Sequence, residues 1–309
     1  MGSMKQPLKR YNDLNGFLRA RFGCRIQKIS VDAGMTCPNR DGTLSRGGCI
    51  YCNDRGSGTG AFARGLSITD QLEAGKAILG PRYKAKGFIA YFQSFSNTYA
   101  PVDVLCRLYD EALAVDGVVG LSVGTRPDCV NEPVLDLLAG HARNHMVWIE
   151  YGLQSASDAT LGRINRGHDV ACFEEAVRAT QGRGILVCAH VILGLPGEDR
   201  SHMMATADTL VRLGVDGVKL HLLYVVRGTK LAALYEKGAY QCLEKDQYYD
   251  LVCDFLERLP EQMVVQRLTG NPHPSELVAP SWALENRRNL APIRQRLAER
   301  DTWQGKALA

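Results

Sequence analysis

The residues most able to do chemistry in this chain are three cysteines within one loop. Cys37, Cys49 and Cys52 are separated mainly by Gly, Asn, Asp, Ser and Pro, the residues of tight turns. Thiolates are soft ligands that favour zinc or iron–sulfur clusters. A structural zinc site and an ordinary cluster each use four protein ligands, so three cysteines leave one iron of a four-iron cluster open. The loop therefore predicts a [4Fe–4S] cluster with one iron free to bind another molecule.

A closed zinc site is the alternative interpretation of the same loop. A distant Cys or His can supply a fourth ligand, and C-x-x-C occurs in both kinds of site. Two details favour the cluster. Tyr51 stands inside the C-x-x-C, which would place an aromatic ring beside the open iron. No second C-x-x-C and no His pair follows at the spacing of a zinc finger.

The pattern of the rest of the chain predicts an α/β domain that positions this loop. The 309 residues, 45% of them hydrophobic, are enough for one large core. An amphipathic helix is expected over residues 8–22. Strands are expected at 25–31, 87–93, 118–123, 146–153, 185–193 and 215–223, with helices after most of them. Later elements are expected at 230–237 and 243–259 as helices, 263–268 as a strand and 282–297 as a helix.

Six strands alternating with helices predict a parallel sheet curled into a partial (β/α)6 barrel of the TIM type. The expected organisation is an N-terminal segment with its helix (1–24), the partial barrel (25–225) and a C-terminal α/β extension (226–309).

Polar residues follow successive strands where a barrel of this kind would build its active site. These residues are Gln93, Ser94 and Ser96 after the second strand, Thr125–Asp128 after the third, Glu150, Gln154 and Ser155 at the end of the fourth, His190 and Gly194–Pro196 at the fifth, and Lys219 and His221 at the sixth. A single polar strand end is often only a cap or a turn, but their repetition at one edge predicts a shared site.

These motifs resemble the radical S-adenosylmethionine (SAM) superfamily. The cysteine loop is similar to its cluster loop, although the gap from Cys37 to Cys49 is longer than the commonest spacing. The segments Thr125-Arg-Pro-Asp128, Glu150-x-Gly-x-Gln154-Ser155, Arg166-Gly-His168 and His190-x-x-x-Gly-Leu-Pro196 resemble the radical SAM module of the Elongator catalytic subunit. Over about residues 8–305 the chain looks most similar to small bacterial YhcC-like proteins, which lack Elongator's acetyltransferase domain.

The resemblance implies an enzyme that reductively cleaves SAM at a [4Fe–4S] cluster to a 5′-deoxyadenosyl radical. Cys37, Cys49 and Cys52 would ligate the cluster, and SAM would bind its open iron. Gln154 and Arg166 match positions that hold SAM in oxygen-independent coproporphyrinogen oxidase. The residues expected at the cofactors are Tyr51, Gln93, Ser94, Ser96, Glu150, Gln154, Ser155, Arg166, His190, Gly194 and Leu195. The Gly-Gly-Glu that usually follows the second strand is absent, and Gln93, Ser94 and Ser96 stand in its place.

Kinship to Elongator implies a tRNA substrate and action on the C5 side chain of the wobble uridine, such as remodelling of a carboxymethylaminomethyl group. Basic residues gather at both ends of the chain, and Lys9, Arg10, Arg287 and Arg288 are expected to bind RNA phosphates, with Arg267 nearer the substrate. An electron donor such as flavodoxin or ferredoxin is also expected. Two other functions stay open: a radical SAM enzyme acting on a small molecule, similar to coproporphyrinogen oxidase or a haem-handling relative, and a non-catalytic zinc- or RNA-binding module.

The composition predicts a cytoplasmic protein without a membrane partner. No apolar run is long enough to span a bilayer, and no signal peptide opens the sequence. The ten cysteines are mostly scattered singly, which suits a reducing compartment better than a disulfide framework.

Overall fold

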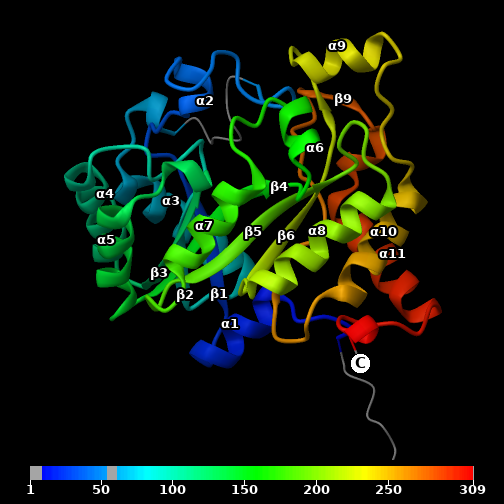
Figure 1. Cartoon of the computed structure of the whole chain (residues 1–309). Coiled ribbons are helices and arrows are strands. Elements are labelled where there is room, and N and C mark those ends of the chain that lie inside the picture. The colour runs from blue at the N-terminus through cyan, green and yellow to red at the C-terminus, as the bar shows by residue number, and fades with distance from the viewer. Residues whose placement is uncertain (1–8, 54–60, 309) are drawn as a thin grey trace, which may run out of the picture.

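The centre of the molecule is a curled parallel sheet with helices along its outer face (Figure 1). The computed structural model describes residues 9–53 and 61–308, apart from the side chains of residues 286–289. Seven strands pair in chain order: β1 (Ile26–Val31), β2 (Gly87–Phe92), β3 (Val118–Thr125), β4 (Met146–Gln154), β5 (Leu186–Leu193), β6 (Gly217–Leu222) and β8 (Val264–Arg267). The predicted partial TIM-type barrel is confirmed.

The number of strands in the sheet differs from the prediction of six. Strand β8 comes from the predicted C-terminal extension and pairs in parallel with β6, with Lys219 beside Arg267. Residues 226–309 therefore complete the sheet as well as extending it. A second, two-stranded antiparallel sheet joins β7 (Val225–Val226) to β9 (Leu277–Ala279).

The helices follow the strands in the alternation that the sequence predicts. They are α1 (Leu14–Phe22), α2 (Pro38–Asp41), α3 (Ile68–Tyr83), α4 (Val102–Ala114), α5 (Glu132–Ala142), α6 (Asp158–Arg163), α7 (Val170–Thr180), α8 (Arg200–Leu213), α9 (Lys230–Glu236), α10 (Lys245–Arg258) and α11 (Asn286–Glu299). Short 3-10 turns lie at Phe62–Arg64, Pro127–Cys129, Ser281–Leu284 and Lys306–Leu308. The capping box at Ser67 and Asp70, which the sequence predicts, opens α3.

The first helix begins later than predicted, because Asp13 is its N-cap. Its carboxylate accepts a hydrogen bond from the backbone N–H of Gly16 at 2.7 Å, as an N-cap does. Its backbone is tied to Val265 of β8. Tyr11, expected inside the helix, therefore precedes it.

Helix α1 closes the end of the barrel where the strands begin. Phe17 packs edge-on against Trp148 with ring centroids 5.9 Å apart, and Leu18 is buried with Ile26, the first residue of β1. The cysteine loop leaves the other end of β1, so the two ends of the barrel have different roles. In Figure 1, α1 lies at the bottom and α2 at the top.

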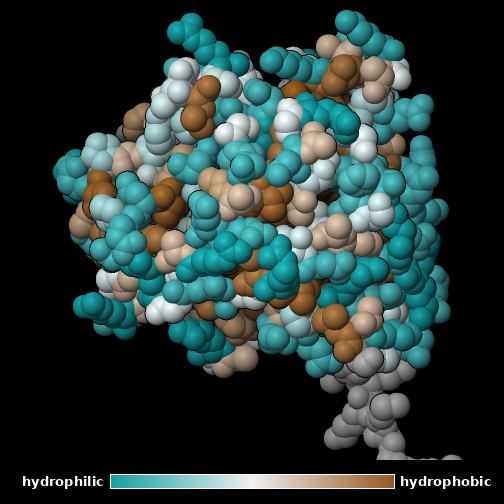
Figure 2. All heavy atoms as spheres, in the orientation of Figure 1, coloured by the Kyte–Doolittle hydropathy of each residue, from teal (hydrophilic) through white to brown (hydrophobic). Residues whose placement is uncertain are grey.

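The strands are buried nearly throughout because helices cover one face and the barrel interior lies against the other. Figure 2 shows that hydrophilic side chains cover most of one face of the molecule, with hydrophobic ones scattered among them. Within the described ranges, no helix is both long and apolar enough to cross a membrane.

Candidate active site

The cysteine loop lies over the carboxyl end of the barrel, where neighbouring elements hold its backbone. Cys37 caps α2, and the backbone N–H of Cys52 donates to the carbonyl of Cys49 at 3.0 Å. The N–H of Ile50 donates to Ile164 at the end of α6, also at 3.0 Å, and the carbonyl of Ile50 accepts from Leu231 of α9 at 2.9 Å. The loop is therefore fixed on both sides by elements far apart in sequence.

The three thiols are close enough to affect one another's charge. Burial, followed by the charges of Cys49 and Cys37, raises the pKa of Cys52 to about 11, although Arg40 opposes the shift. Among the residues that the structure describes, no three His, Cys, Asp or Glu side chains are placed to hold a single metal ion. Cluster ligands, by contrast, each bind a different iron, so their sulfurs need not converge on one point.

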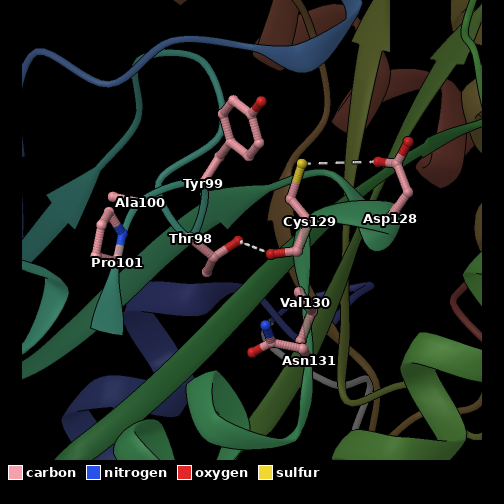
Figure 3. A pocket seen from close by; sticks show the side chains of 8 residues that line it. All are labelled: Thr98, Tyr99, Ala100, Pro101, Asp128, Cys129, Val130 and Asn131. Atoms are coloured by element: carbon pink, nitrogen blue, oxygen red, sulfur yellow. Dashed lines mark hydrogen bonds between the residues drawn. The ribbon is translucent and has the colours of Figure 1, made fainter. Parts of the chain in front are cut away.

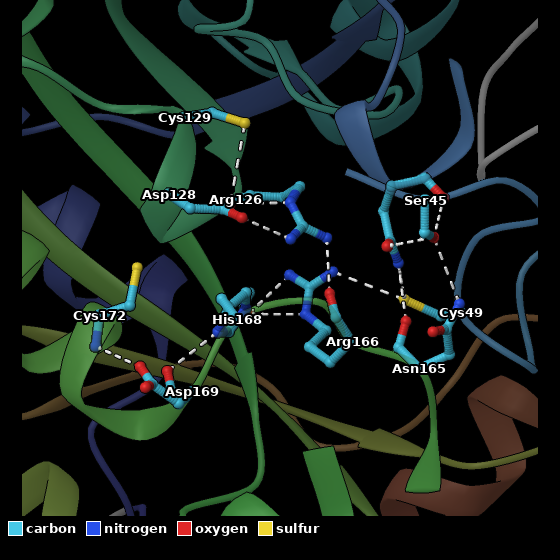
Figure 4. A network of polar contacts seen from close by, with 12 residues as sticks. Ser45, Cys49, Arg126, Asp128, Cys129, Asn165, Arg166, His168, Asp169 and Cys172 are labelled. Carbon is cyan, nitrogen blue, oxygen red and sulfur yellow. Dashed lines mark hydrogen bonds and ion pairs between the residues drawn. The ribbon is translucent and has the colours of Figure 1, made fainter. Parts of the chain in front are cut away.

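Two side chains approach the buried sulfur of Cys49, and Figure 4 shows one of them, Arg166. Nη1 of Arg166 and Nδ2 of Asn39 each lie 3.7 Å from that sulfur. Asn39 also donates to the carbonyl of Asn165 at 2.7 Å. Burial disfavours a charged guanidinium, but Cys49 and Tyr51 hold the pKa of Arg166 above its usual value. A fixed positive charge therefore stands beside the sulfur.

Arg166 is held in place by the end of β4 and by a second arginine. Its Nη2 donates to the carbonyl of Gly152 at 2.7 Å, and its own carbonyl accepts from Arg126 at 2.8 Å. Arg126 forms a bidentate ion pair with Asp128, with bonds of 2.8 and 2.6 Å (Figure 4). The Thr125-Arg-Pro-Asp128 motif thus holds the backbone of Arg166 in place through Arg126.

Gln154 and Arg166 converge around Gly152. A Cβ added to Gly152 would lie 2.5 Å from Nη2 of Arg166 and 2.7 Å from Nε2 of Gln154, so a side chain at this position would displace both groups. Gln154 itself has a φ of 77°, and the pairing of β4 with β5 shifts register at this point. Such left-handed backbone is uncommon outside glycine and occurs at functional sites. The fold therefore brings the Gln154 amide and the Arg166 guanidinium together around Gly152.

The end of β2 lies on the other side of the loop. The backbone N–H of Ser96 donates to the carbonyl of Thr36 at 3.2 Å, directly before Cys37. Ser94 is buried, and its hydroxyl has no hydrogen-bond partner among the described residues. Gln93 accepts a hydrogen bond from Ser30 at 3.0 Å. An unsatisfied buried hydroxyl at the end of β2 fits a polar ligand bound at this edge of the sheet.

Tyr51 and Leu195, both expected near the adenine of SAM, belong to one apolar region of the site. Leu195 is buried in a cluster with Ile50, and Tyr51 packs against that cluster. Gly194 has a φ of 90°, and its carbonyl accepts from Tyr240 at 2.9 Å. Burial, followed by Cys49, raises the pKa of Tyr51 well above its usual value.

A hollow opens between the ends of β2 and β3, beside the cysteine loop. Its lining residues are Thr98, Tyr99, Ala100, Pro101, Asp128, Cys129, Val130 and Asn131 (Figure 3). The hydroxyl of Tyr99 is 2.9 Å from that of Thr43, which belongs to the cysteine loop. The sequence motifs did not predict this opening.

Glu150 and His190 belong to a second cluster, inside the barrel. The buried Glu150 carboxylate accepts hydrogen bonds from Lys28 at 2.6 Å and His190 at 2.7 Å, and is also bonded to Lys219 and Ser122. Burial would raise the pKa of Glu150, but Lys219 and Lys28 hold it well below its usual value. Burial lowers the pKa of Lys219 to about 7 despite that carboxylate. The sequence analysis gave Lys28 no role in the site. A lysine within a strand of alternating apolar residues could have indicated a buried ion pair.

Comparison with known proteins decides the family. Residues 40–210 match the model of the radical SAM superfamily, and residues 215–299 match the radical SAM C-terminal domain. The chain belongs to the radical SAM superfamily. It is 43% identical to the uncharacterized protein YtqA of Bacillus subtilis, over 96% of this chain and 92% of that protein. It is 41% identical to YhcC of Escherichia coli, over 91% and 90%.

The predicted kinship to Elongator is also found. The chain is 31% identical to Elongator complex protein 3 of Danio rerio over 58% of its own length, which is 32% of that protein. Among solved structures, Elp3 of Methanocaldococcus infernus, lacking its N-terminus, matches 90% of this chain and 64% of its own with a TM-score of 0.69. At 14% identity this likeness concerns the fold.

The chain is therefore a radical SAM enzyme whose cofactors are a [4Fe–4S] cluster and SAM. When bound, they supply the one-electron cleavage that yields a 5′-deoxyadenosyl radical. The residues fit these groups: Cys37, Cys49 and Cys52 would hold the cluster, while Gln154, Arg166 and the hydroxyl of Ser94 would face SAM. The buried Cys49 and the half-buried ring of Tyr51 would help to exclude water, which a reactive radical requires.

Three of the residues expected at the cofactors, Ser155, Glu150 and His190, form hydrogen bonds elsewhere in the barrel. Ser155 is buried, and its hydroxyl is bonded to Glu198 and to the backbone N–H of Ser157, so it supports the turn after β4. Glu150 and His190 bond to the lysines of the barrel interior and show no contact with the cysteine loop among the described residues. We interpret all three as residues that support the site.

The predicted basic rim at the barrel mouth is wrong for the N-terminal residues. Lys9 pairs with Asp13 at 2.5 Å, and Arg10 pairs with Asp301 at 3.2 Å. The two chain ends do meet, since Gln304 donates to the carbonyl of Arg10 at 2.9 Å, but they meet at the end closed by α1. The side chains of Arg287 and Arg288 lie outside the described residues.

Proposed function

We propose that this radical SAM enzyme modifies tRNA and acts on the C5 side chain of the wobble uridine, for example by remodelling a carboxymethylaminomethyl group. The sequence relationship to Elongator complex protein 3 supports the choice of RNA. The observation that carries the proposal is a set of basic side chains beside the cysteine loop.

These side chains are Arg46, Arg227 and Lys230, which we call the mouth cations. All are exposed, and none forms an ion pair or side-chain hydrogen bond with a described residue. Nζ of Lys230 lies 3.6 Å from where a Cβ on Gly47 would stand, so α9 brings it to the cysteine loop. Arg227 precedes it in the turn before α9. Unpaired cations around an opening suit the phosphates of a polyanion.

The reaction also needs an electron donor for the cluster, and the protein must be in the same compartment as its substrate. We propose flavodoxin or ferredoxin as the electron donor, because the cluster must be reduced at low potential. We propose a cytoplasmic location, because tRNA is found there and none of the ten cysteines forms a disulfide.

Filter binding of tRNA over a salt series tests the proposal. Phosphate contacts release counterions, so affinity should fall steeply with salt. The double variant Arg46→Ala/Lys230→Ala should bind more weakly and reduce that slope by roughly one to two units, about one for each phosphate contact. Lys9→Ala is the matched control, since Lys9 is ion-paired at the closed end, and should leave the slope unchanged.

A second measurement addresses the reaction itself. Anaerobically reconstituted enzyme, reductant and SAM should change the nucleosides of tRNA, as read by mass spectrometry. Affinity that does not depend on salt, or no binding at low salt, would favour a small-molecule substrate instead.

A further inference from the structure

Arg267 stands in the barrel interior, and no residue that the structure describes pairs with its side chain. It ends β8 beside Lys219 of β6, and residues paired across parallel strands face the same side of a sheet. Lys219 contacts the buried Glu150, so Arg267 also faces the interior. Its half-buried guanidinium forms no hydrogen bond or ion pair with a described residue.

A bulge in β8 places two polar residues on that side. Val218 pairs with Val265 and Lys219 with Arg267, which leaves Gln266 as an extra residue between the pairs. The side-chain oxygen of Gln266 accepts a hydrogen bond from Lys28 at 2.7 Å. Bulges re-aim side chains and are common near active sites. Here the bulge turns both Gln266 and Arg267 toward the interior.

The charges around Arg267 do not balance. Three basic side chains, Lys28, Lys219 and Arg267, share the interior with Glu150, whose oxygens are already bonded to Lys28, Lys219, His190 and Ser122. His221 follows Lys219 by two residues in β6, so its ring faces the same side of the sheet as Lys219 and lies diagonal to Arg267. Glu150 cannot neutralise Arg267 as well.

Unused hydrogen-bond donors and acceptors surround the same place. Nε2 of His221 and Nε2 of Gln266 are buried without a partner among the described residues. The rings of His190 and His221 lie 5.2 Å apart. Unsatisfied buried polar atoms are rare in native proteins and indicate a ligand or water that completes them. An anion with several oxygens would satisfy Arg267 and His221 together.

We propose that Arg267, with His221 beside it, binds a carboxylate on the reacting side chain of the substrate. This inference rests on the proposed function. A guanidinium matches a carboxylate through two parallel hydrogen bonds. A nucleic-acid backbone would meet the exposed mouth cations, whereas Arg267 is recessed and suits a short side chain that enters the barrel. Arg166 contacts the sulfur of Cys49, so it would act on the cofactors, whereas Arg267 would bind the substrate.

The test uses two anticodon stem-loop RNAs that differ at one group. One carries a carboxymethylaminomethyl side chain on the wobble uridine, and the other carries its neutral amide. Holoenzyme should bind the carboxylate form about ten- to a hundredfold more tightly, as a charge-assisted hydrogen bond predicts. Arg267→Gln should bind both equally, with SAM affinity and the cluster spectrum unchanged. Arg227→Gln, the matched control, should weaken both RNAs alike and keep the preference.

The outcomes separate this inference from the proposed function. If wild type binds both RNAs equally, the carboxylate site is refuted while RNA binding stands. If Arg267→Gln loses SAM affinity, the arginine serves the cofactor and the inference also fails. If neither RNA binds, the proposed function fails, and malonate then serves as the probe. Malonate that shifts the NMR resonances of His221 in wild type but not in Arg267→Gln supports the carboxylate site, and no shift refutes it.

Discussion

Nη1 of Arg166 lies 3.7 Å from the sulfur of Cys49, while Nη2 of the same guanidinium donates to the carbonyl of Gly152 at 2.7 Å. One buried side chain therefore links the cysteine loop to the end of β4. Hydrogen bonds and positive charge near cluster sulfurs raise the reduction potential, so Arg166 is placed to tune the cluster as well as to face SAM.

Arg166→Met should lower the midpoint potential of the cluster because it removes that charge and hydrogen bond. We expect a shift of roughly 60 mV, which corresponds to about a tenfold change for a one-electron couple. An anaerobic redox titration followed by EPR measures it. Arg163→Met is the control, since Arg163 donates to the carbonyl of Pro196 and not to a cysteine. An unchanged potential in Arg166→Met would show that the charge is screened from the cluster.

Loss of any one of the three loop cysteines should abolish the cluster. Cys37→Ala, Cys49→Ala and Cys52→Ala should each lose the iron–sulfur absorbance and labile sulfide after reconstitution. Cys172→Ala should keep both, since Cys172 lies in α7 away from the loop. Stoichiometric zinc without labile sulfide in the wild type would contradict the assignment of these ligands.

Replacing Gln154 should weaken SAM binding while the cluster spectrum is unchanged. Gln154→Gly and Gln154→Ala both remove the side-chain amide, so both should lose affinity, by roughly tenfold for one hydrogen bond. The φ of 77° makes alanine strained, so the alanine variant should also be less stable than the glycine variant by about 1–2 kcal/mol. Calorimetric titration and urea unfolding separate the two effects. Wild-type SAM affinity in the glycine variant would refute the role of the side chain.

Glu150→Gln should destabilise the barrel strongly. It leaves Lys28 and Lys219 without their buried counter-charge, which typically costs about 3–5 kcal/mol of unfolding free energy. The exposed pair of Asp103 and Arg107 offers the control, because Asp103→Asn should change stability by at most about 1 kcal/mol. Equal effects of the two substitutions in urea unfolding would show that the interior network contributes little.

Stability should fall as the pH drops from about 6.5 toward 4. Burial lowers the pKa of His168 and of His190 from 6.5 to about 4, and that of His221 falls well below 6.5. The unfolded chain therefore takes up protons in this window that the folded chain does not, so acid favours unfolding. Each such histidine contributes a slope of about 1.4 kcal/mol per pH unit.

Urea unfolding at several pH values measures that slope. His168→Asn should reduce it by about one proton, whereas the exposed His273→Asn should not. A slope that is unaffected by His168→Asn would mean that this ring titrates alike in both states.

The sequence alone determined the family, the class of fold and the residues of the cluster loop. Cys37, Cys49, Cys52 and Tyr51 are local in the chain, and loop composition together with thiol chemistry is enough to interpret them. Strand and helix alternation likewise comes from short-range periodicity, which local side chains dictate. Arg166 and Gln154 were found through motif resemblance, and the structure places both around Gly152, beside Cys49.

What only the tertiary structure decided depends on which strands become neighbours and which way a side chain points. The strand at 264–267 could be predicted, but its place beside β6 is a long-range pairing that no local pattern encodes. The same pairing puts Arg267 into the barrel. Lys9 and Arg10 share the basic character of Arg46 and Lys230 in sequence, yet ion pairs at the end closed by α1 occupy the first two. Charge is a property of the residue, but its availability to a partner depends on what the fold packs against it.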